Sequence, residues 1–331
     1  MSRMTRALLA AMLAVGCAVE AQACGTTLYG SITLSADMVC PPGTDGLVLG
    51  ADHVRIDLNG FRITSPNSIG TVGIRSSGFH GIKVIGPGAV AGFSSSLVIE
   101  GGDRHEIREV DVAAVSLVSP GHGVILRNTS GTVVEKSAVG DLHLSSDAGQ
   151  RADGNRVWGN KARSVDLYGC MTTRNEIADN DIRFPRTFPA VSLVGGAKGN
   201  VVMHNRIESG SVWIGGASEN LVEGNSLVNP PYASYIHAGV IMGHHPSPCS
   251  GLALVPAEEN VVRYNGIEGA YIGVALMDGA LRNKILDNKI YGAVAIGMHF
   301  SAGSADNDGR GNWFSGVARD VTDLGRGNLW P

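Results

Sequence analysis

The sequence predicts an all-β solenoid, and three observations support this fold class. A short asparagine-containing motif recurs six times, segments of alternating apolar and variable residues lie between its copies, and no copy shows helical periodicity. Glycine, with 46 of the 331 residues, supplies many candidate corners. These features indicate a repeating unit of one short supersecondary turn, stacked many times along one axis.

The motif is an asparagine, any residue, valine or isoleucine, two further residues, a second asparagine, one residue and an apolar residue. Successive copies begin 20, 25, 20, 40 and 23 residues apart. Stacked at the corners of a solenoid, these side chains are expected to hydrogen-bond along the stack and to satisfy backbone groups in the turns. The predicted structural ladder comprises Asn155, Asn175, Asn200, Asn220, Asn260 and Asn283 as first asparagines, and Asn160, Asn180, Asn205, Asn225, Asn265 and Asn288 as second asparagines.

Between the motifs, triplets of apolar, variable and apolar residues predict further short strands. Three such strands in a unit of about 20 residues describe one coil of a parallel β-helix, with strands of neighbouring coils about 4.8 Å apart. We expect a single-stranded solenoid of about 10–12 coils. The triplets occupy residues 124–126, 142–144, 165–167, 191–193, 212–214, 240–242, 274–276 and 294–296.

These repeats resemble those of the right-handed parallel β-helix proteins, the pectin-lyase-like superfamily. The resemblance covers about residues 44–320, and residues 24–26, 37–40 and 46–60 are similar to the opening of many secreted bacterial members. It implies a right-handed coil, in keeping with the preference of parallel crossovers. We expect a signal peptide at 1–23, a disulfide-stapled cap at 24–43, the β-helix at 44–320 with loop insertions at 229–238 and 243–258, and a tail at 321–331.

The amino-terminal residues have the pattern of an export signal. Arg3 and Arg6 precede the apolar residues 7–15, and small residues at Ala21 and Ala23 predict cleavage before Cys24. This arrangement predicts a secreted or periplasmic protein. The alternative is lipidation at Cys17, which would anchor the protein to a membrane.

Cleavage before residue 24 leaves four cysteines, an even number for an oxidising compartment. Cys24 and Cys40 are expected to pair and to staple the exposed edge of the first coil. Cys170 and Cys249 lie three coils apart, about 14 Å, whereas a disulfide needs Cα atoms within about 7 Å. They can pair only if residues 243–257 fold back along the axis, and two free thiols are the alternative.

Composition limits the partners. The formal net charge is -4 and only 17% of residues are charged, which gives no reason to expect nucleic acid and announces no long basic groove. No apolar run after residue 23 is long enough to span a bilayer.

One column of outward-facing side chains follows from strand alternation, because the residue between two inward apolar positions points away from the core. His143 and Asp166 fall on adjacent coils in this column, with Tyr168 one outward position further along and Arg127 and Asp141 at the margins. The column reads Ile125, His143, Asp166, Ser192, Trp213, Ile241, Ala275 and Ala295, and the column two residues earlier begins Gly123, Asp141 and Ser164.

The residue types in this column suit proton transfer on an acidic sugar. Trp213 offers an apolar face to a sugar ring, and Arg127 can pair with a uronate carboxylate. His143 or Tyr168 can remove or return the proton at C5, with Asp166 orienting the imidazole. We therefore predict a polysaccharide partner and β-elimination or epimerisation of a uronate. The predicted catalytic residues are His143, Asp166, Tyr168 and Arg127, and the predicted substrate-binding residues are Asp141, Ser192, Trp213, Tyr235 and His237.

Other functions stay open on the sequence. Hydrolysis needs two carboxyl groups, and Asp141 with Asp166, about 8 Å apart, would fit an inverting mechanism. The sequence Gly121-His122-Gly123 resembles a polygalacturonase motif, but its partner motifs are absent, as is the Asp-Pro-His motif of mannuronan epimerases. A non-catalytic glycan-binding, adhesion or cell-envelope protein would use the same face.

No cofactor is predicted, although two segments have metal-like patterns. His237, His244 and His245 would have to converge to bind a transition metal, as in a periplasmic metal-accessory protein resembling the β-helical copper proteins. Residues 306–312 resemble part of a Ca²⁺ loop that lacks its terminal carboxylate, and turn chemistry also explains that pattern.

Overall fold

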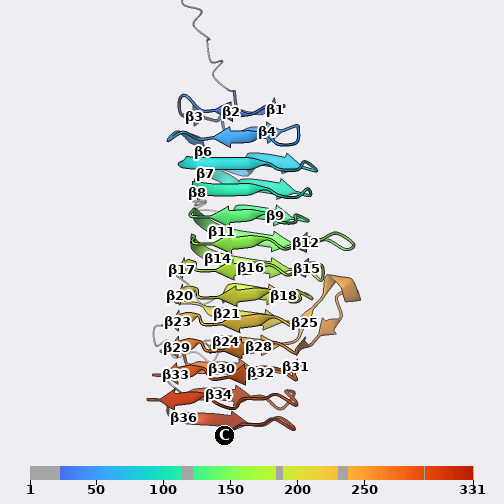
Figure 1. The fold of residues 1–331 in the computed structure, drawn as a ribbon, viewed down its shortest axis with the longest axis vertical. Helices are drawn as coiled ribbons and strands as arrows, with labels where there is room; N and C mark the ends of the chain where they lie inside the picture. Colours follow the sequence, from blue (N-terminus) through green and yellow to red (C-terminus); the bar gives the residue numbers. More distant parts are fainter. Residues whose placement is uncertain (1–22, 113–121, 184–188, 230–237, 294, 331) are drawn as a thin grey trace, which may run out of the picture.

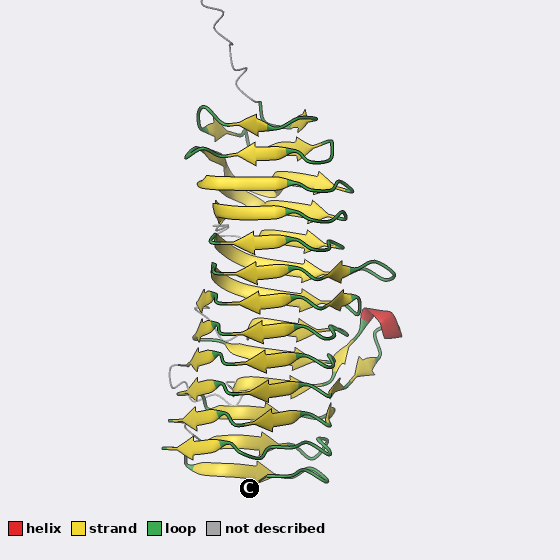
Figure 2. Ribbon diagram, viewed as in Figure 1, coloured by secondary structure: helices red, strands yellow, loops and turns green. Residues whose placement is uncertain are grey.

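The protein is a right-handed β-solenoid of about 12 parallel stacked coils with almost no helix (Figures 1 and 2). The structure is a computed structural model, and it describes residues 23–112, 122–183, 189–229, 238–293 and 295–330. The predicted all-β parallel β-helix is therefore confirmed. The described chain begins at one end of the solenoid and reaches its last residue at the other (Figure 1).

Each coil adds strands to three parallel faces, and neighbouring coils pair in register. The first face carries the predicted site and is called the site face. It contains β1 (Thr26–Leu28), β4 (Leu47–Leu49), the last parts of β6 (Arg62–Ser77) and β7 (Lys83–Glu100), β9 (His122–Arg127), the last parts of β11 (Ala138–Ser145) and β14 (Lys161–Tyr168), β18 (Pro189–Val194), β21 (Ser211–Gly215), β24 (Ala238–Gly243), β30 (Ile272–Leu276), β34 (Ile296–Phe300) and β36 (Arg319–Asp323).

The second and third faces consist of shorter strands. The second contains β2 (Ile32–Thr33), β5 (Arg55–Asp57), the first parts of β7 and β8 (Glu106–Val112), β10 (Val133–Glu135), β13 (Arg156–Trp158), β16 (Glu176–Ala178), β19 (Val201–Met203), β22 (Leu221–Glu223), β28 (Val261–Arg263) and β32 (Lys284–Leu286). The third contains β3 (Met38–Val39), parts of β6, β7, β8, β11 and β14, β17 (Asp181–Arg183), β20 (Arg206–Glu208), β23 (Ser226–Val228), β29 (Gly266–Glu268), β33 (Lys289–Tyr291) and β35 (Trp313–Ser315).

Short additional strands lie outside the three faces. β12 (Ala152–Asp153) pairs with β15 (Thr172–Thr173), and β27 (Ala257–Glu258) pairs with β31 (Ala280–Leu281). After β24 the chain leaves the solenoid as an antiparallel hairpin of β25 (His245–Pro246) and β26 (Leu254–Val255), joined through the 3₁₀ turn η1 (Pro248–Ser250).

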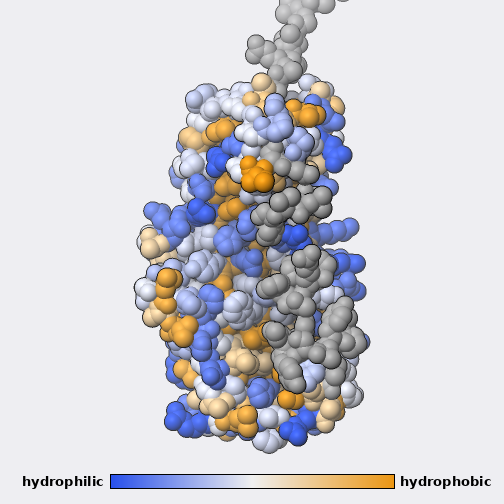
Figure 3. Space-filling view, turned by 180° about the vertical axis from the view of Figure 1, so that it is seen from behind, coloured by the Kyte–Doolittle hydropathy of each residue, from blue (hydrophilic) through white to orange (hydrophobic). Residues whose placement is uncertain are grey.

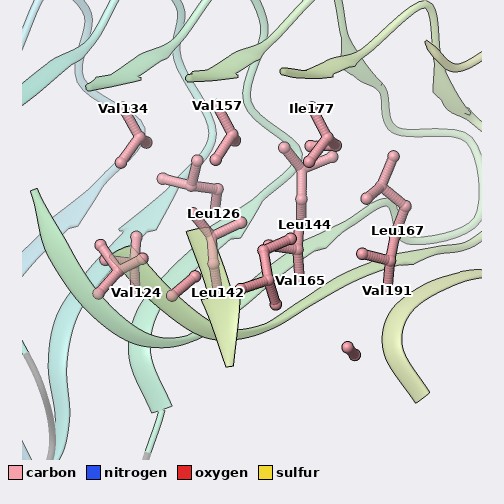
Figure 4. Packing of buried hydrophobic residues seen from close by; sticks show 14 of the residues in the cluster. Val124, Leu126, Val134, Leu142, Leu144, Val157, Val165, Leu167, Ile177 and Val191 are labelled. Carbon is pink, nitrogen blue, oxygen red and sulfur yellow. The ribbon is translucent and has the colours of Figure 1, made fainter. Parts of the chain in front are cut away.

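The core consists of apolar side chains that alternate with outward residues along every strand. Val124 and Leu126 on the site face point inward toward Val134 of the second face, and the coils that follow repeat this contact (Figure 4). These side chains have no exposed surface. Since each coil is too small to bury such residues alone, stacking on neighbouring coils completes the core.

The asparagines of the motif form two buried hydrogen-bonded ladders, one on each side of the second face. At Asn200, for example, Oδ1 accepts hydrogen bonds from the backbone N (3.0 Å) and Nδ2 (2.9 Å) of Asn175 in the preceding coil. Its own Nδ2 donates to the Thr172 carbonyl and to Oδ1 of Asn220, both at 3.0 Å. Each side chain thus joins three coils.

The residue before a ladder asparagine has a left-handed backbone. Gly154, with φ +64°, precedes Asn155, whereas Asp179, with φ +55°, precedes Asn180. Glycine adopts this conformation without strain and other residues do so at a cost. Corners with glycine at this position are therefore unstrained, and corners with another residue there have a strained backbone.

The two ends of the solenoid lie within the same parallel stack. β1 already pairs with β4, and β36 pairs with β34, so stacked coils extend into both the expected cap and the expected tail. Cys24 and Cys40 form a disulfide in the first coil. Within the described segments, no helix is long and apolar enough to cross a bilayer. On the side shown in Figure 3, apolar residues lie in separate groups among polar ones.

Candidate functional site

The site face brings the predicted column together. β11 pairs with β14 so that His143 faces Asp166, Asp166 faces Ser192 on β18, and Ser192 faces Trp213 on β21. Arg127, Ser145 and Tyr168 occupy successive strands one outward position further along. We call His143, Asp166, Ser192 and Trp213 the site column.

Two register details differ from the sequence interpretation. A β-bulge between Asp141 and Leu142 pairs Asp141 with His122, so that His122 takes the outward place expected for Gly123. At the other end, β34 begins at residue 296, and Ala275 faces His299 instead of Ala295. The bulge interrupts the alternation at the first place, whereas at the second place the strand lies later in the sequence than the predicted triplet 294–296.

His143 is half-buried and held in its neutral form. Its ring lies 5.8 Å from the ring of His122, centroid to centroid, at an interplanar angle of 45°. Burial lowers the pKa of His143 to about 4, and positive charges on His122 and Arg127 contribute further. At neutral pH the imidazole therefore has a free lone pair that can accept a proton.

Asp166 has the opposite shift. Burial raises the pKa of this carboxyl to about 6, a hydrogen bond with Ser192 opposes the rise, and the negative charge of Asp141 adds to it. Ser192 is only 5% exposed. Among the described residues no hydrogen bond joins Asp166 to His143. The imidazole is thus not oriented by Asp166 as the sequence suggested, and Ser192 is a partner of Asp166.

Asp141 is engaged by its neighbours. The Arg163 guanidinium donates two hydrogen bonds to the Asp141 carboxylate, one of them 2.7 Å long, and the Ser164 hydroxyl donates a third at 2.8 Å. The carboxylate is buried. Since these three bonds occupy the carboxylate oxygens, Asp141 is poorly placed to activate the water that an inverting hydrolase requires.

Arg127 and Tyr168 lie beside the column. Arg127 forms an ion pair with Glu100 of the preceding coil at 3.2 Å, and both side chains are partly exposed, at 44% and 34%. Exposed pairs of this kind contribute at most about 1 kcal/mol, so a substrate anion can compete for the guanidinium. The Tyr168 ring packs over Gly195, where an added Cβ would lie 2.9 Å from Cε2.

Trp213 is bordered by the hairpin of β25 and β26. The ring of His245 lies 5.1 Å from the indole in an edge-to-face arrangement. The hairpin folds back along the axis toward the earlier coils. Gly196 lies between Cys170 and Ser247 of the hairpin, and a Cβ added to it would be close to both Cys170 Cβ and Ser247 Oγ. This is the direction that a Cys170–Cys249 disulfide needs. Cys170 is disulfide-bonded, while the side chain of Cys249 lies outside the described structure, so this pairing stays a prediction.

Two predicted binding residues, Tyr235 and His237, lie outside the described residues. Within the described ranges, no group of three or more His, Cys, Asp or Glu side chains is arranged to hold a metal ion. In the segment that resembles a Ca²⁺ loop, Asp308 pairs with Arg310 at 2.7 Å. The amide of Asn307 continues an asparagine ladder.

Three residues that shape this face were not among the predicted site residues: His122, Arg163 and His245. His122 belongs to the sequence Gly121-His122-Gly123, whose partner motifs are absent. The alternation of inward and outward residues along a strand does not predict the bulge beside it. The site column and Arg127 together present a neutral imidazole, a carboxyl with a pKa of about 6, a guanidinium and an indole on one face. This combination can accept a proton, donate a proton and contact a sugar ring.

Comparisons with known proteins agree on the fold. No curated protein matches the sequence. Two crystal structures of the periplasmic alginate epimerase AlgG, one of them a mutant, superpose with TM-scores of 0.60 and 0.58 at 11% identity, covering 92% of this chain and 83% of that chain. The Agl-KA catalytic domain superposes with a TM-score of 0.51 at 10% identity, covering 92% of this chain and 62% of the other.

Residues 141–316, more than half of the chain, match the family described as the right handed beta helix region. The matched segment contains both asparagine ladders and the site column. The chain therefore belongs to the right-handed β-helix family.

Proposed function

We propose that this protein processes a uronate-containing polysaccharide on its site face, by removing the proton at C5 of a sugar ring. One observation carries the proposal: the adjacent residues His143 and Asp166 have pKa values shifted in opposite directions, to about 4 and about 6. Paired groups with diverging pKa values commonly divide the roles of base and acid. Between about pH 4 and about pH 6, His143 is neutral and serves as the base, while Asp166 is protonated and serves as the acid.

In β-elimination the lone pair of His143 takes the C5 proton, and the electrons of that C–H bond form the C4–C5 double bond. The C4–O4 bond breaks, and O4 receives the proton of Asp166. In epimerisation the C5 proton leaves in the same way, and Tyr168 returns a proton to the opposite face of the ring. Both steps conserve protons and electrons without an added oxidant or reductant.

Two further side chains support an acidic sugar as substrate. Arg127 can leave its exposed pair with Glu100 and neutralise the uronate carboxylate, which makes the C5 proton more acidic. Trp213 supplies an apolar surface for a pyranose ring. A periplasmic alginate epimerase is among the proteins of similar fold, and alginate is a uronate polymer.

We also propose that the protein works outside the cytoplasm, as a secreted or periplasmic protein with a signal peptide at residues 1–23. The Cys24–Cys40 disulfide favours an oxidising compartment. The domain limits given above, with the β-helix at residues 44–320, belong to the same proposal.

The proposal is tested by incubating the mature protein with alginate, pectate and glycosaminoglycans. Ultraviolet absorbance of the unsaturated uronate detects elimination, and deuterium uptake at C5 from heavy water detects proton exchange. Activity should fall at least about 100-fold in His143→Gln and Asp166→Asn, as expected for loss of an acid or base. The matched control is Asp179→Asn, an exposed carboxylate at a distant corner. The proposal is refuted if none of these polymers gives an unsaturated product or takes up deuterium.

A second candidate function is glycan binding without catalysis. The observation in its favour is that Asp141 is occupied by Arg163 and Ser164, and Arg127 by Glu100, which leaves few free polar groups. Retention of the protein on an immobilised polymer without deuterium uptake would favour this candidate. The third candidate, a metal-accessory protein, has no converging histidines among the described residues to support it.

A further inference from the structure

The hairpin of β25 and β26 places a second aromatic ring against the site face. β25 pairs antiparallel with β26, so that His245 faces Val255 and Pro246 faces Leu254. The hairpin projects from the side of the solenoid at the level of β21 (Figure 1). His245 therefore meets Trp213 from a strand that belongs to another part of the repeat, at 5.1 Å and an interplanar angle of 75°.

The hairpin is fixed to the solenoid at two points. Ser247 is 3% exposed, and its hydroxyl donates a hydrogen bond of 3.1 Å to the Gly195 carbonyl, two coils before β24. Gly216 has φ +55°, and a Cβ there would lie 2.7 Å from the His245 carbonyl oxygen. Only glycine allows this approach, so the hairpin backbone rests directly on the solenoid backbone. His245 is thus held in place before any ligand binds.

The hydrogen bond of His245 defines what its ring offers to a ligand. Nδ1 lies 2.8 Å from the Pro246 carbonyl oxygen. Because a carbonyl can only accept, Nδ1 carries the proton, and in the neutral ring Nε2 has a free lone pair. An imidazole acceptor beside an indole surface can bind a sugar ring, whose hydroxyl groups donate and whose C–H face packs on the aromatic ring.

We infer that Trp213 and His245 form a second sugar-binding position, which holds a uronate ring of the polymer next to the ring that reacts. Trp213 lies two strands from Asp166, about 9–10 Å at the spacing of parallel strands. A ring at Trp213 is therefore not the ring that exchanges protons with Asp166. This inference rests on the proposed function, and it assigns to His245 a role in binding long substrates.

The test compares His245→Ala with His244→Ala, a matched control because His244 is the exposed neighbouring histidine. Calorimetry measures the binding of size-defined oligomannuronates and oligogalacturonates to the full mature protein. We expect the Kd for hexasaccharides to rise about tenfold in His245→Ala, the loss of about one hydrogen bond and part of an aromatic wall. His244→Ala should bind as the wild type does. With polymer as the substrate, His245→Ala should raise KM and leave kcat unchanged.

The outcomes separate this inference from the proposed function. If His245→Ala binds hexasaccharides as tightly as the wild type, the second position is refuted and the proposed chemistry stands. If the wild type binds the oligosaccharides without converting them, the catalytic proposal fails and the comparison of variants still decides the role of His245. If the wild type binds none of them, both fail. Equal urea midpoints for the three proteins confirm that the hairpin variants are folded.

Discussion

Replacing Asp166 with asparagine should stabilise the protein at neutral pH and have little effect in acid. Burial raises the pKa of the carboxyl from 3.8 to about 6 in the folded state. Between these values the folded protein keeps a proton that the unfolded chain releases, so stability falls as the pH rises from about 4 to about 6. Above that range the ionised carboxylate carries the full cost, which the neutral asparagine avoids.

The size of this effect follows from the shift. One pKa unit corresponds to about 1.36 kcal/mol, so the interval from 3.8 to about 6 amounts to about 3 kcal/mol. His143 should behave in the opposite sense, because its pKa falls from 6.5 to about 4. Its neutral form is favoured in the folded state, so stability is lost as the pH falls through this interval. His143→Gln should therefore gain about 3 kcal/mol relative to wild type near pH 4.

Urea unfolding at about pH 4, 6 and 8, followed by circular dichroism, measures both effects. In the wild type, the contributions of Asp166 and His143 to the free energy of unfolding change in opposite directions over the same pH interval. Each variant removes one of the two groups, so the contribution of the remaining group can be measured. Asp179→Asn, which removes an exposed carboxylate, controls for the change in net charge. An identical stability change in Asp166→Asn at all three pH values would show that the carboxyl is not buried in the folded protein, and would remove the basis for its role as the acid.

Three further predictions concern the scaffold. Asn200→Ala should lower the free energy of unfolding by about 3–5 kcal/mol, because the buried partners of its amide in both neighbouring coils lose their hydrogen bonds; a loss below about 1 kcal/mol in urea would contradict the ladder. Asp179→Gly should stabilise by about 1 kcal/mol by relieving the left-handed backbone, and an unchanged or lower midpoint would count against that strain. Thiol titration of the unreduced mature protein in denaturant should find no free thiol if Cys170 pairs with Cys249, whereas two free thiols would exclude the pairing.

The fold was predictable because its determinants repeat. Six copies of one motif and the apolar triplets give the strand direction, the coil size and the inward residues without reference to distant contacts. The ladder nevertheless extends beyond the motif to Asn307 and Asn312. Gly309 occupies the apolar position of that last copy, and a Cβ there would lie 2.6 Å from Met298 Cε and 3.1 Å from Phe300 Cζ. Side chains of β34 thus fill the space that an apolar side chain at position 309 would occupy. A motif defined by local sequence does not predict this replacement.

The site was predictable only where alternation holds. The positions of His143, Asp166 and Trp213 follow from strand period and coil spacing, and the structure places them in one column, with His143 and Asp166 on adjacent strands and Trp213 two strands beyond Asp166. The bulge that brings His122 beside His143 inserts one residue and defeats that period. The contact of His245 with Trp213 depends on a hairpin that folds back along the axis, and the sequence between residues 243 and 257 contains no periodic signal for its direction.

The asparagine ladders make every junction between their coils chemically alike. In each ladder a coil receives two hydrogen bonds at one amide oxygen and donates two to the next coil, so the coil from Asn155 to Asn175 presents the same ladder contacts to its neighbours as the coil that follows. Removing or duplicating a whole coil therefore leaves the remaining junctions intact. The length of the face along which a polymer can lie is then an adjustable property, set by the number of coils and independent of the residues that carry the chemistry.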